Sequence, residues 1–240
     1  MTQVNAIKVR NEARISVNKL GEYLGATPSK RHKLLNDQKR PAAFKAPYYQ
    51  EAERPIVDYL TSKINIDSLV DTARKLLERS PGSDWDEHRN PNCADAILHL
   101  AKIKQTDALM EFEREAGQRT NGKIMISGLP VSVRPEVILK GKDRSGNPVY
   151  GAIKLNISGS LTLNGQVGTH PVGEYVATTV HQYMEQYLAD NGMEGKAKPG
   201  MCYVVDVFAR QVYQAPNNCR SMRKDIAAAC DEIKNQWPHI

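Results

Sequence analysis

Glu136 and Lys154 carry the clearest chemical signal in this chain of 240 residues. Glu136 follows a proline at the start of an alternating apolar run, and Lys154 ends the sequence Ala152-Ile153-Lys154 in a second such run. A carboxylate binds Mg²⁺ through hard oxygen ligands, and the metal lowers the pKa of a bound water and offsets phosphate charge. A lysine beside it can stabilise developing negative charge. The pair therefore predicts metal-assisted phosphodiester hydrolysis.

This chemistry requires the two residues to lie on adjacent strands. Strands are predicted over Val131–Lys140 and Val149–Ser158, joined by a turn rich in glycine, asparagine and proline. Because side chains alternate along a strand, Glu136 and Lys154 can share the polar face of this hairpin. The same pattern is typical of an ordinary hairpin with one solvated face. In that case the two residues would form a cross-strand ion pair contributing less than about 1 kcal/mol.

The elements around this hairpin alternate between helical and extended periods. Their order is helix, three strands, helix, strand and a further helix. Gly159–Gly173 is predicted to be a long loop or an extra hairpin. In addition to the two hairpin strands, the predicted elements are a helix over Thr106–Ala116, a strand over Ile124–Ser127, a helix over Glu174–Asn191, a strand over Cys202–Tyr213 and a helix over Asn218–Trp237.

The first hundred residues are predicted to be mainly helical, with loops between the helices. We expect residues 1–104 to form a helical, basic N-terminal region and residues 105–240 to form the core with its closing helix. Ser80–Asn92 is dense in breakers and is predicted to be a polar loop. The helices predicted in the N-terminal region cover Ile15–Leu24, Ser29–Gln38, Tyr48–Ser62, Ile66–Arg79 and Cys93–Ile103.

With its elements in this order, the segment from Thr106 to Tyr213 resembles the PD-(D/E)XK nuclease superfamily, and within it the RecB-like exonucleases. The stretch 128–136 is similar to the strand that leads into the first catalytic acid, and Gly151-Ala-Ile-Lys154 is similar to the strand that carries the motif lysine. The resemblance implies an α/β fold with a restriction-endonuclease-like αβββαβ core. It also implies a Mg²⁺- or Mn²⁺-dependent nuclease in which Glu136 and Lys154 are catalytic.

The chain departs from the family pattern at Ala152, where Asp or Glu is expected. A second acid must then complete the metal site, and RecB-like enzymes take one ligand from the upstream helix. That helix offers Glu111, Glu113 and Glu115, of which Glu113 is the predicted ligand. Asp206 is a second candidate because a buried carboxylate in an apolar strand needs a partner. Asp206 could instead pair with a lysine or a helix N-terminus. Gln182 is a candidate DNA contact, although the family's QxxxY motif is not reproduced.

Basic residues gather at the N-terminus. Residues 1–45 hold ten Lys and Arg residues against three acidic ones, in a chain of net charge +6. Such a segment favours a polyanion partner, because phosphate contacts release counterions. The alternatives are a solvated helix face and a loosely matched helix-turn-helix. The residues predicted to bind DNA phosphates are Lys30, Arg31, Lys33, Lys39 and Arg40.

Other classes of protein lack support in the sequence. There is no glycine-rich phosphate loop, no GxSxG elbow and no HExxH pair. The four cysteines are scattered, so we expect them to be reduced and mostly buried. No window approaches the roughly 18 apolar residues that span a bilayer, and no signal peptide is recognised. We therefore expect a cytoplasmic protein without a membrane segment.

Together these features predict a metal-dependent nuclease that hydrolyses DNA. The alternative is a catalytically degenerate nuclease fold that binds DNA or a protein partner, and Ala152 motivates it directly. A third reading is a helix-turn-helix regulator whose C-terminal half senses a ligand.

Overall fold

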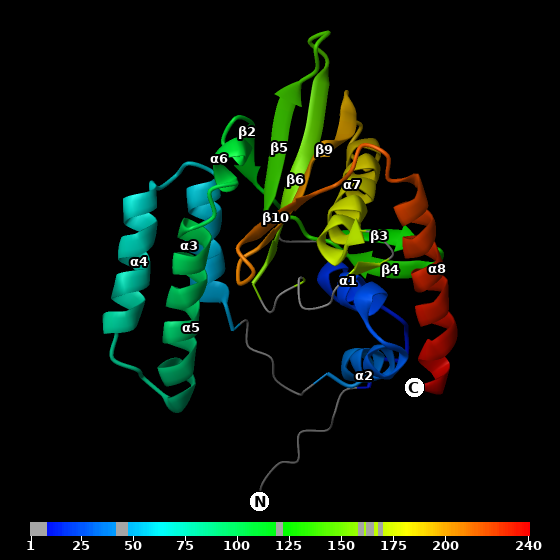
Figure 1. Ribbon diagram of the computed structural model, residues 1–240, viewed down its shortest axis with the longest axis horizontal. Helices are drawn as coiled ribbons and strands as arrows, with labels where there is room; N and C mark the ends of the chain where they lie inside the picture. The colour runs from blue at the N-terminus through cyan, green and yellow to red at the C-terminus, as the bar shows by residue number, and fades with distance from the viewer. Residues whose placement is uncertain (1–8, 42–47, 119–121, 158–160, 162–165, 168–169) are drawn as a thin grey trace, which may run out of the picture.

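The computed structural model describes residues 9–41, 48–118, 122–157, 161, 166–167 and 170–240. A five-stranded sheet lies at its centre, with α3, α4 and α5 on one side and α1, α7 and α8 on the other (Figure 1). The strand order is β10-β9-β6-β5-β2. These strands are β2 (Glu113–Ala116), β5 (Val137–Lys142), β6 (Pro148–Asn156), β9 (Lys196–Asp206) and β10 (Gln211–Gln214).

Strand direction reverses twice along the neighbours β2, β5, β6 and β9, from β2 to β5 and again from β5 to β6. β2 pairs antiparallel with β5, and β5 pairs antiparallel with β6. β6 and β9 are parallel, and α7 (Val172–Asp190) lies in the connection between them. A crossover of this kind is required because a tight turn cannot join parallel strands. The chain is thus a mixed α/β protein.

A second, smaller sheet has the order β1-β4-β3. It consists of β1 (Ile15–Ser16), β4 (Leu129–Ser132) and β3 (Lys123–Ile126). The β3–β4 hairpin turns through Ser127 and Gly128, which both have positive φ, as a two-residue type I′ turn requires. β1 runs parallel to β4 and so attaches the N-terminal region to this sheet.

The remaining helices surround the two sheets. In the part of the chain described, no helix is both long enough and apolar enough to cross a membrane. A short hairpin, β7 (Gln166–Val167) with β8 (His170–Pro171), precedes α7. The helices are α1 (Val17–Gly25), α2 (Pro28–Lys39), α3 (Gln50–Leu60), α4 (Ile66–Glu78), α5 (Asp84–Ala101), α6 (Thr106–Leu109) and α8 (Arg220–Gln236), and the 3₁₀ turn Trp237–His239 follows α8.

Two hydrophobic clusters pack against opposite faces of the large sheet. Ile138 and Val204 belong to the cluster that contains α1, α7 and α8, whereas Val137 and Val205 belong to the cluster that contains α3, α4 and α5. This division follows from the alternation of side chains along each strand. Each cluster contains residues from both sides of the domain boundary expected after residue 104. That boundary stays a prediction.

The helix predicted over Thr106–Ala116 is wrong. Only Thr106–Leu109 is helical, and Glu113–Ala116 forms the edge strand β2. Pairing with β5 overrides the local helical pattern, and Lys140 Nζ donates to Glu115 Oε2 at 2.7 Å across this edge. The strand predicted over Ile124–Ser127 exists as β3, but it lies in the small sheet.

Three further predictions need correction. The polar loop expected over Ser80–Asn92 is largely helical, because α5 begins at Asp84, where the Ser83 side chain caps the Asp86 N–H. The single strand expected over Val131–Lys140 is interrupted between β4 and β5. The strand expected over Cys202–Tyr213 is divided into β9 and β10 by a turn.

One further prediction is confirmed, and another falls largely on residues that the structure does not describe. All four cysteines are free and buried, as expected. Most of the loop or hairpin expected over Gly159–Gly173 lies outside the described residues, and its described part includes β7 and β8.

Candidate functional site

A cavity of about 750 Å³ lies where β2 and β6 end and β5 begins. These three strand ends meet because β5 runs antiparallel to both of its neighbours. α3 provides the opposite wall. The cavity is lined by Gln50, Glu53, Arg54, Val57, Asp58, Lys63, Ala116, Gly117, Gln118, Arg134, Pro135, Glu136 and Lys154.

Glu136 and Lys154 are in direct contact in this cavity. Lys154 Nζ donates to Glu136 Oε1, and the backbone N–H of Leu155 donates to Glu136 Oε2 at 2.5 Å. Lys154 Nζ also lies 3.3 Å from the carbonyl oxygen of Arg134. The Glu136 and Lys154 side chains are only 12% and 13% exposed. The carboxylate is therefore held by one ammonium and one backbone amide with little access to solvent.

The environment of Glu136 acts on its pKa in two directions. Burial raises the pKa above its ordinary value, since a low-dielectric site disfavours the charged form. The ammonium of Lys154 lowers the pKa, and the negative charge of Glu53 raises it further. Perturbed carboxyl groups in a cavity are typical of functional sites, although structural ion pairs produce them too.

The segment that carries Glu136 is positioned by a close backbone approach at Gly117. The Gly117 N–H donates to the carbonyl of Glu136 at 2.8 Å. A Cβ at this glycine would lie 2.0 Å from the carbonyl oxygen of Pro135, so no larger residue fits without displacing the chain. Glu136 N–H in turn donates to Ile153 at 2.9 Å and fixes its position beside β6.

Besides Glu136, the cavity is lined by the carboxylates of Glu53 and Asp58, and the sequence prediction missed both. Glu53 lies on α3, far in the sequence from the two strands of the hairpin. It nevertheless lines the same cavity, and its negative charge raises the pKa of Glu136. The signal was present in the sequence, because Gln50, Glu53, Arg54 and Val57 recur at the spacing of one helix face. The other face of α3 is apolar and buried through Ala52, Ile56 and Leu60.

The two acids predicted to complete a metal site lie elsewhere. Glu113 is exposed on β2 opposite Lys140, at the far end of the pairing with β5 from Glu136. Asp206 is fully buried at the end of β9, where it accepts from the N–H groups of Leu161 and Ala209. Neither residue lines the cavity, so the structure does not bring either one to Glu136.

Gln182 also lies away from the cavity. It is half-buried on α7, and its Oε1 has no hydrogen-bond partner within the described chain. Across the same described residues, no three His, Cys, Asp or Glu side chains form a group arranged to hold a metal ion.

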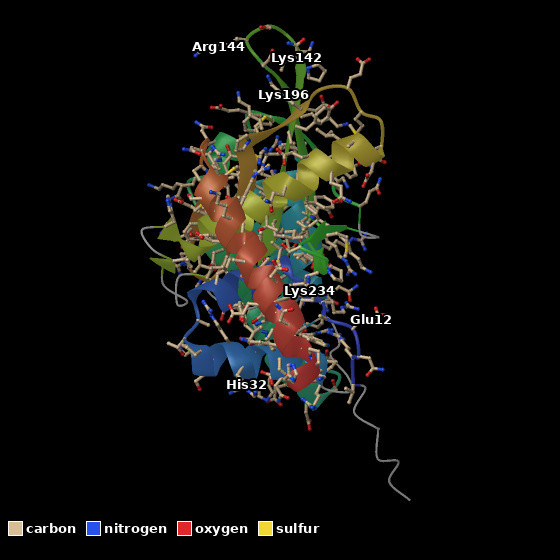
Figure 2. All side chains as sticks on the ribbon, turned by 90° about the vertical axis from the view of Figure 1, so that its right-hand side faces the viewer. Glu12, His32, Lys142, Arg144, Lys196 and Lys234 are labelled. Atoms are coloured by element: carbon tan, nitrogen blue, oxygen red, sulfur yellow. The ribbon has the colours of Figure 1, made fainter. Side chains whose placement is uncertain are left out.

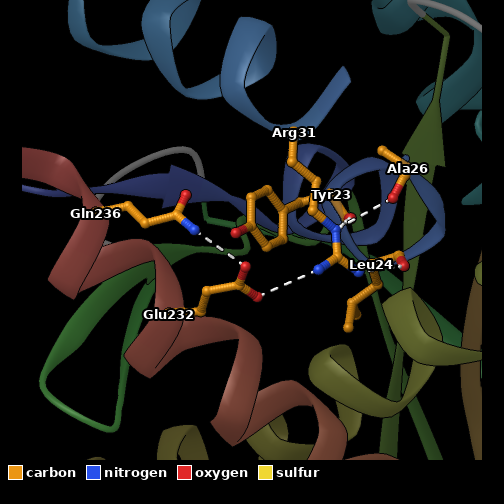
Figure 3. A network of polar contacts seen from close by, with 6 residues as sticks. All are labelled: Tyr23, Leu24, Ala26, Arg31, Glu232 and Gln236. Atoms are coloured by element: carbon orange, nitrogen blue, oxygen red, sulfur yellow. Dashed lines mark hydrogen bonds and ion pairs between the residues drawn. The ribbon is translucent and has the colours of Figure 1, made fainter. Parts of the chain in front are cut away.

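Arg31, one of the predicted phosphate-binding residues, instead joins α1 to α8 (Figure 3). Its guanidinium donates to the carbonyl oxygens of Tyr23 and Ala26 at 3.0 and 3.1 Å, and to that of Leu24 at 3.2 Å. Nη1 lies 3.2 Å from Glu232 Oε2. The side chain thereby supplies donors to carbonyls at the C-terminal end of α1, where that of Tyr23 also accepts from the Ala26 N–H.

The other basic residues in and next to α2 differ in whether their side chains contact the rest of the protein or solvent. Lys39 Nζ donates to the carbonyl oxygens of Trp237 and Ile240 at 2.7 and 2.8 Å, and Arg40 donates to Ile240 at 3.1 Å. Lys30 and Lys33 are exposed and line a shallow depression of about 220 Å³ between α1 and α2. Of the five predicted phosphate contacts, three therefore hold the fold together, and two point to solvent.

Comparisons with known proteins do not assign the chain to a family. No protein-family model matches it, and no curated protein matches it.

Proposed function

We propose that this protein hydrolyses phosphodiester bonds of DNA in a metal-dependent reaction at the cavity of Glu136 and Lys154. The observation that carries the proposal is the convergence of Glu53, Glu136 and Lys154 from three separate elements on one cavity. We further infer that the core is of the restriction-endonuclease type. The neighbour order β2-β5-β6-β9, with α7 between the two parallel strands, supports an αβββαβ arrangement, although the β3–β4 hairpin is inserted after β2.

Glu53 and Glu136 are the residues that would hold Mg²⁺ or Mn²⁺. Mg²⁺ sites in phosphoryl-processing proteins commonly use one or two carboxylates, with waters and substrate phosphates completing the shell. Two carboxylates, one from α3 and one from the residue that precedes β5, fit that requirement, and Glu53 would replace the acid absent at Ala152. The bound cation would supply an activated water and offset phosphate charge.

Lys154 has the geometry to assist this reaction. Its ammonium already lies against Glu136 and the carbonyl of Arg134, so it is held within the cavity. With Glu136 engaged by a cation, the same ammonium can donate to the attacking water or to a phosphate oxygen. The Leu155 N–H would hold Glu136 Oε2 in place while Lys154 changes its hydrogen-bond partner.

Cleavage assays test the proposal. Linear duplex, circular duplex and single-stranded DNA are incubated with the protein and Mg²⁺, Mn²⁺ or EDTA. Glu136→Ala and Lys154→Ala are compared with Glu115→Ala and Lys140→Ala, which alter the other cross-strand Glu–Lys pair of the sheet outside the cavity. Metal-dependent cutting lost only in the first two variants supports the proposal. Cutting that persists in both would refute the assignment.

Binding of DNA or a protein without cleavage is the second candidate function. It is favoured by Ala152, which is completely buried, and by Glu136, whose two oxygens already accept bonds from Lys154 and Leu155. A protein that binds DNA in every metal but never cuts it would favour this candidate.

A further inference from the structure

Two arginines line the same cavity without a partner in the described part of the chain. Arg54 comes from α3, one residue after Glu53, and Arg134 comes from the connection between β4 and β5. Within the described residues, neither guanidinium makes a hydrogen bond or ion pair, whereas Arg31, Arg114 and Arg223 are each engaged by several acceptors.

Arg134 is held in an unusual backbone conformation. Its φ is +43°, in the left-handed region that residues with a side chain rarely adopt. Two flanking contacts fix it there: Val133 N–H donates to Gly122 at 2.8 Å, and Lys154 Nζ lies 3.3 Å from the Arg134 carbonyl. Such conformations persist where the surrounding structure imposes them, and they cluster at ligand sites.

The residues that line the cavity carry one more positive than negative charge. Asp58 is paired with Lys63 at 3.5 Å, and Glu136 is paired with Lys154. Glu53 is then the remaining acid opposite two guanidiniums among the residues that line the cavity. A cation bound to Glu53 and Glu136 would increase the positive surplus, so the cavity favours an anionic ligand.

We propose that Arg54 and Arg134 bind backbone phosphates of a DNA strand and so place that strand over Glu136. This inference rests on the proposed function, and it moves the phosphate contacts from α2 to the cavity itself. Guanidinium groups bind phosphate oxygens in pairs, and phosphates repeat along a nucleic-acid strand, so two separate arginines match consecutive groups.

Fluorescence anisotropy with labelled single-stranded and duplex DNA tests this inference in EDTA, where cleavage does not interfere. The variants are Arg54→Ala and Arg134→Gly, the second of which also relieves the left-handed conformation. The matched control is Arg144→Ala, at the exposed tip of the β5–β6 hairpin, where Figure 2 shows Arg144 beside Lys142 and Lys196. All three substitutions remove one positive charge.

We expect each cavity variant to weaken DNA binding by about 10-fold, the loss typical of a charge-assisted contact. The slope of log K against log salt should fall by about 0.7–0.9 for each phosphate contact removed. Arg144→Ala should bind within about twofold of the unaltered protein. Cavity variants that bind within twofold of the unaltered protein, an unaltered protein that does not bind DNA, or an equal loss in Arg144→Ala would overturn the inference.

The outcome is separable from that of the proposed function. If the cavity variants bind normally while Glu136-dependent cleavage persists, the phosphate assignment fails and hydrolysis stands. If the cavity variants lose DNA binding, and the unaltered protein does not cut DNA with any of the metals tested, the phosphate assignment stands and the proposed hydrolysis fails.

Discussion

Lys154 and Glu136 contact each other across neighbouring strands, with both side chains almost excluded from solvent. This is not the solvated cross-strand pair that strand alternation alone would suggest, because exposed pairs contribute little and tolerate loss of one member. Removing one member of a nearly buried pair leaves the other charge without compensation.

Lys154→Met should therefore destabilise the protein by an amount that depends on pH. Without the ammonium, the pKa of Glu136 rises further above its ordinary value. A raised folded-state pKa favours the folded protein at low pH, and this advantage is lost as pH rises through the folded-state pKa. Thermal unfolding should show the gap between the variant and the unaltered protein widening from pH 4 to pH 8. Adding Glu136→Gln should narrow that gap at pH 8, and a gap independent of pH would contradict the prediction.

Ala152→Asp, which restores the acid of the family pattern, should reduce stability. Ala152 is fully buried in the hydrophobic cluster with Ile138 and Cys202, so a carboxylate there would be shielded from solvent among apolar side chains. We expect a loss of about 3 kcal/mol, which lowers the unfolding midpoint by about 10 °C in a protein of this size. Ala152→Val serves as the control for added volume. An unchanged midpoint for Ala152→Asp would mean that this position can hold an acid.

Arg31→Ala should lower the stability of the fold, because this side chain is engaged in contacts within the protein. The substitution removes the guanidinium donor from the carbonyls of Tyr23, Leu24 and Ala26, of which only that of Tyr23 keeps a described donor, the Ala26 N–H at 3.2 Å, and the expected cost is about 1–3 kcal/mol. Lys30→Ala, at the adjacent exposed position, should change stability by less than about 0.5 kcal/mol. Chemical denaturation measures both. Equal and small effects would argue that the α1–α8 junction does not depend on Arg31.

His181 should make the fold less stable in mild acid. Its Nδ1 accepts from Arg223 at 2.7 Å, Nε2 lies 3.4 Å from the Ala197 carbonyl, and Glu185 is the nearest acid, at 3.7 Å. Burial lowers the pKa of this imidazole, and Arg223 adds to the decrease. A lowered folded-state pKa contributes stability that is fully present above about pH 6.5 and is lost as pH falls below that value.

Denaturation midpoints between pH 7.5 and 5 test this dependence. His181→Gln should flatten the curve, whereas the exposed His32→Gln on α2 should leave it unchanged. If both variants keep the slope of the unaltered protein, another group carries the pH dependence.

The sequence predicted the elements with strong local patterns. The amphipathic helix α4 was found almost to its ends, and β6, the strand that carries Lys154, was placed within two residues of its observed bounds. Both depend on periodicity, which is readable from neighbours in the chain. Glu113–Ala116 was mistaken for helix because its structure depends on pairing with β5, which no local pattern reports.

The composition of the cavity could be predicted only in part. Glu136 and Lys154 stand out because each interrupts an apolar strand. Glu53 and Arg54 occupy the polar face of an ordinary amphipathic helix, and such faces usually meet solvent. Only the packing of α3 beside β2 turns that face toward the strand ends. The contacts of Arg31 with Glu232 and of Lys39 with Trp237 could not be read from the sequence for the same reason, since each joins residues about two hundred positions apart.

One measurement tests the central claim most directly: metal-dependent DNA cleavage by Glu53→Gln compared with Glu51→Gln. The two residues lie on the same helix, but Glu53 lines the cavity, whereas Glu51 faces Arg79 and Arg89 on the surface. The account predicts that Glu53→Gln lowers the cleavage rate by at least about 100-fold, and that Glu51→Gln leaves it unchanged. Cleavage by Glu53→Gln at the rate of the unaltered protein would contradict the account.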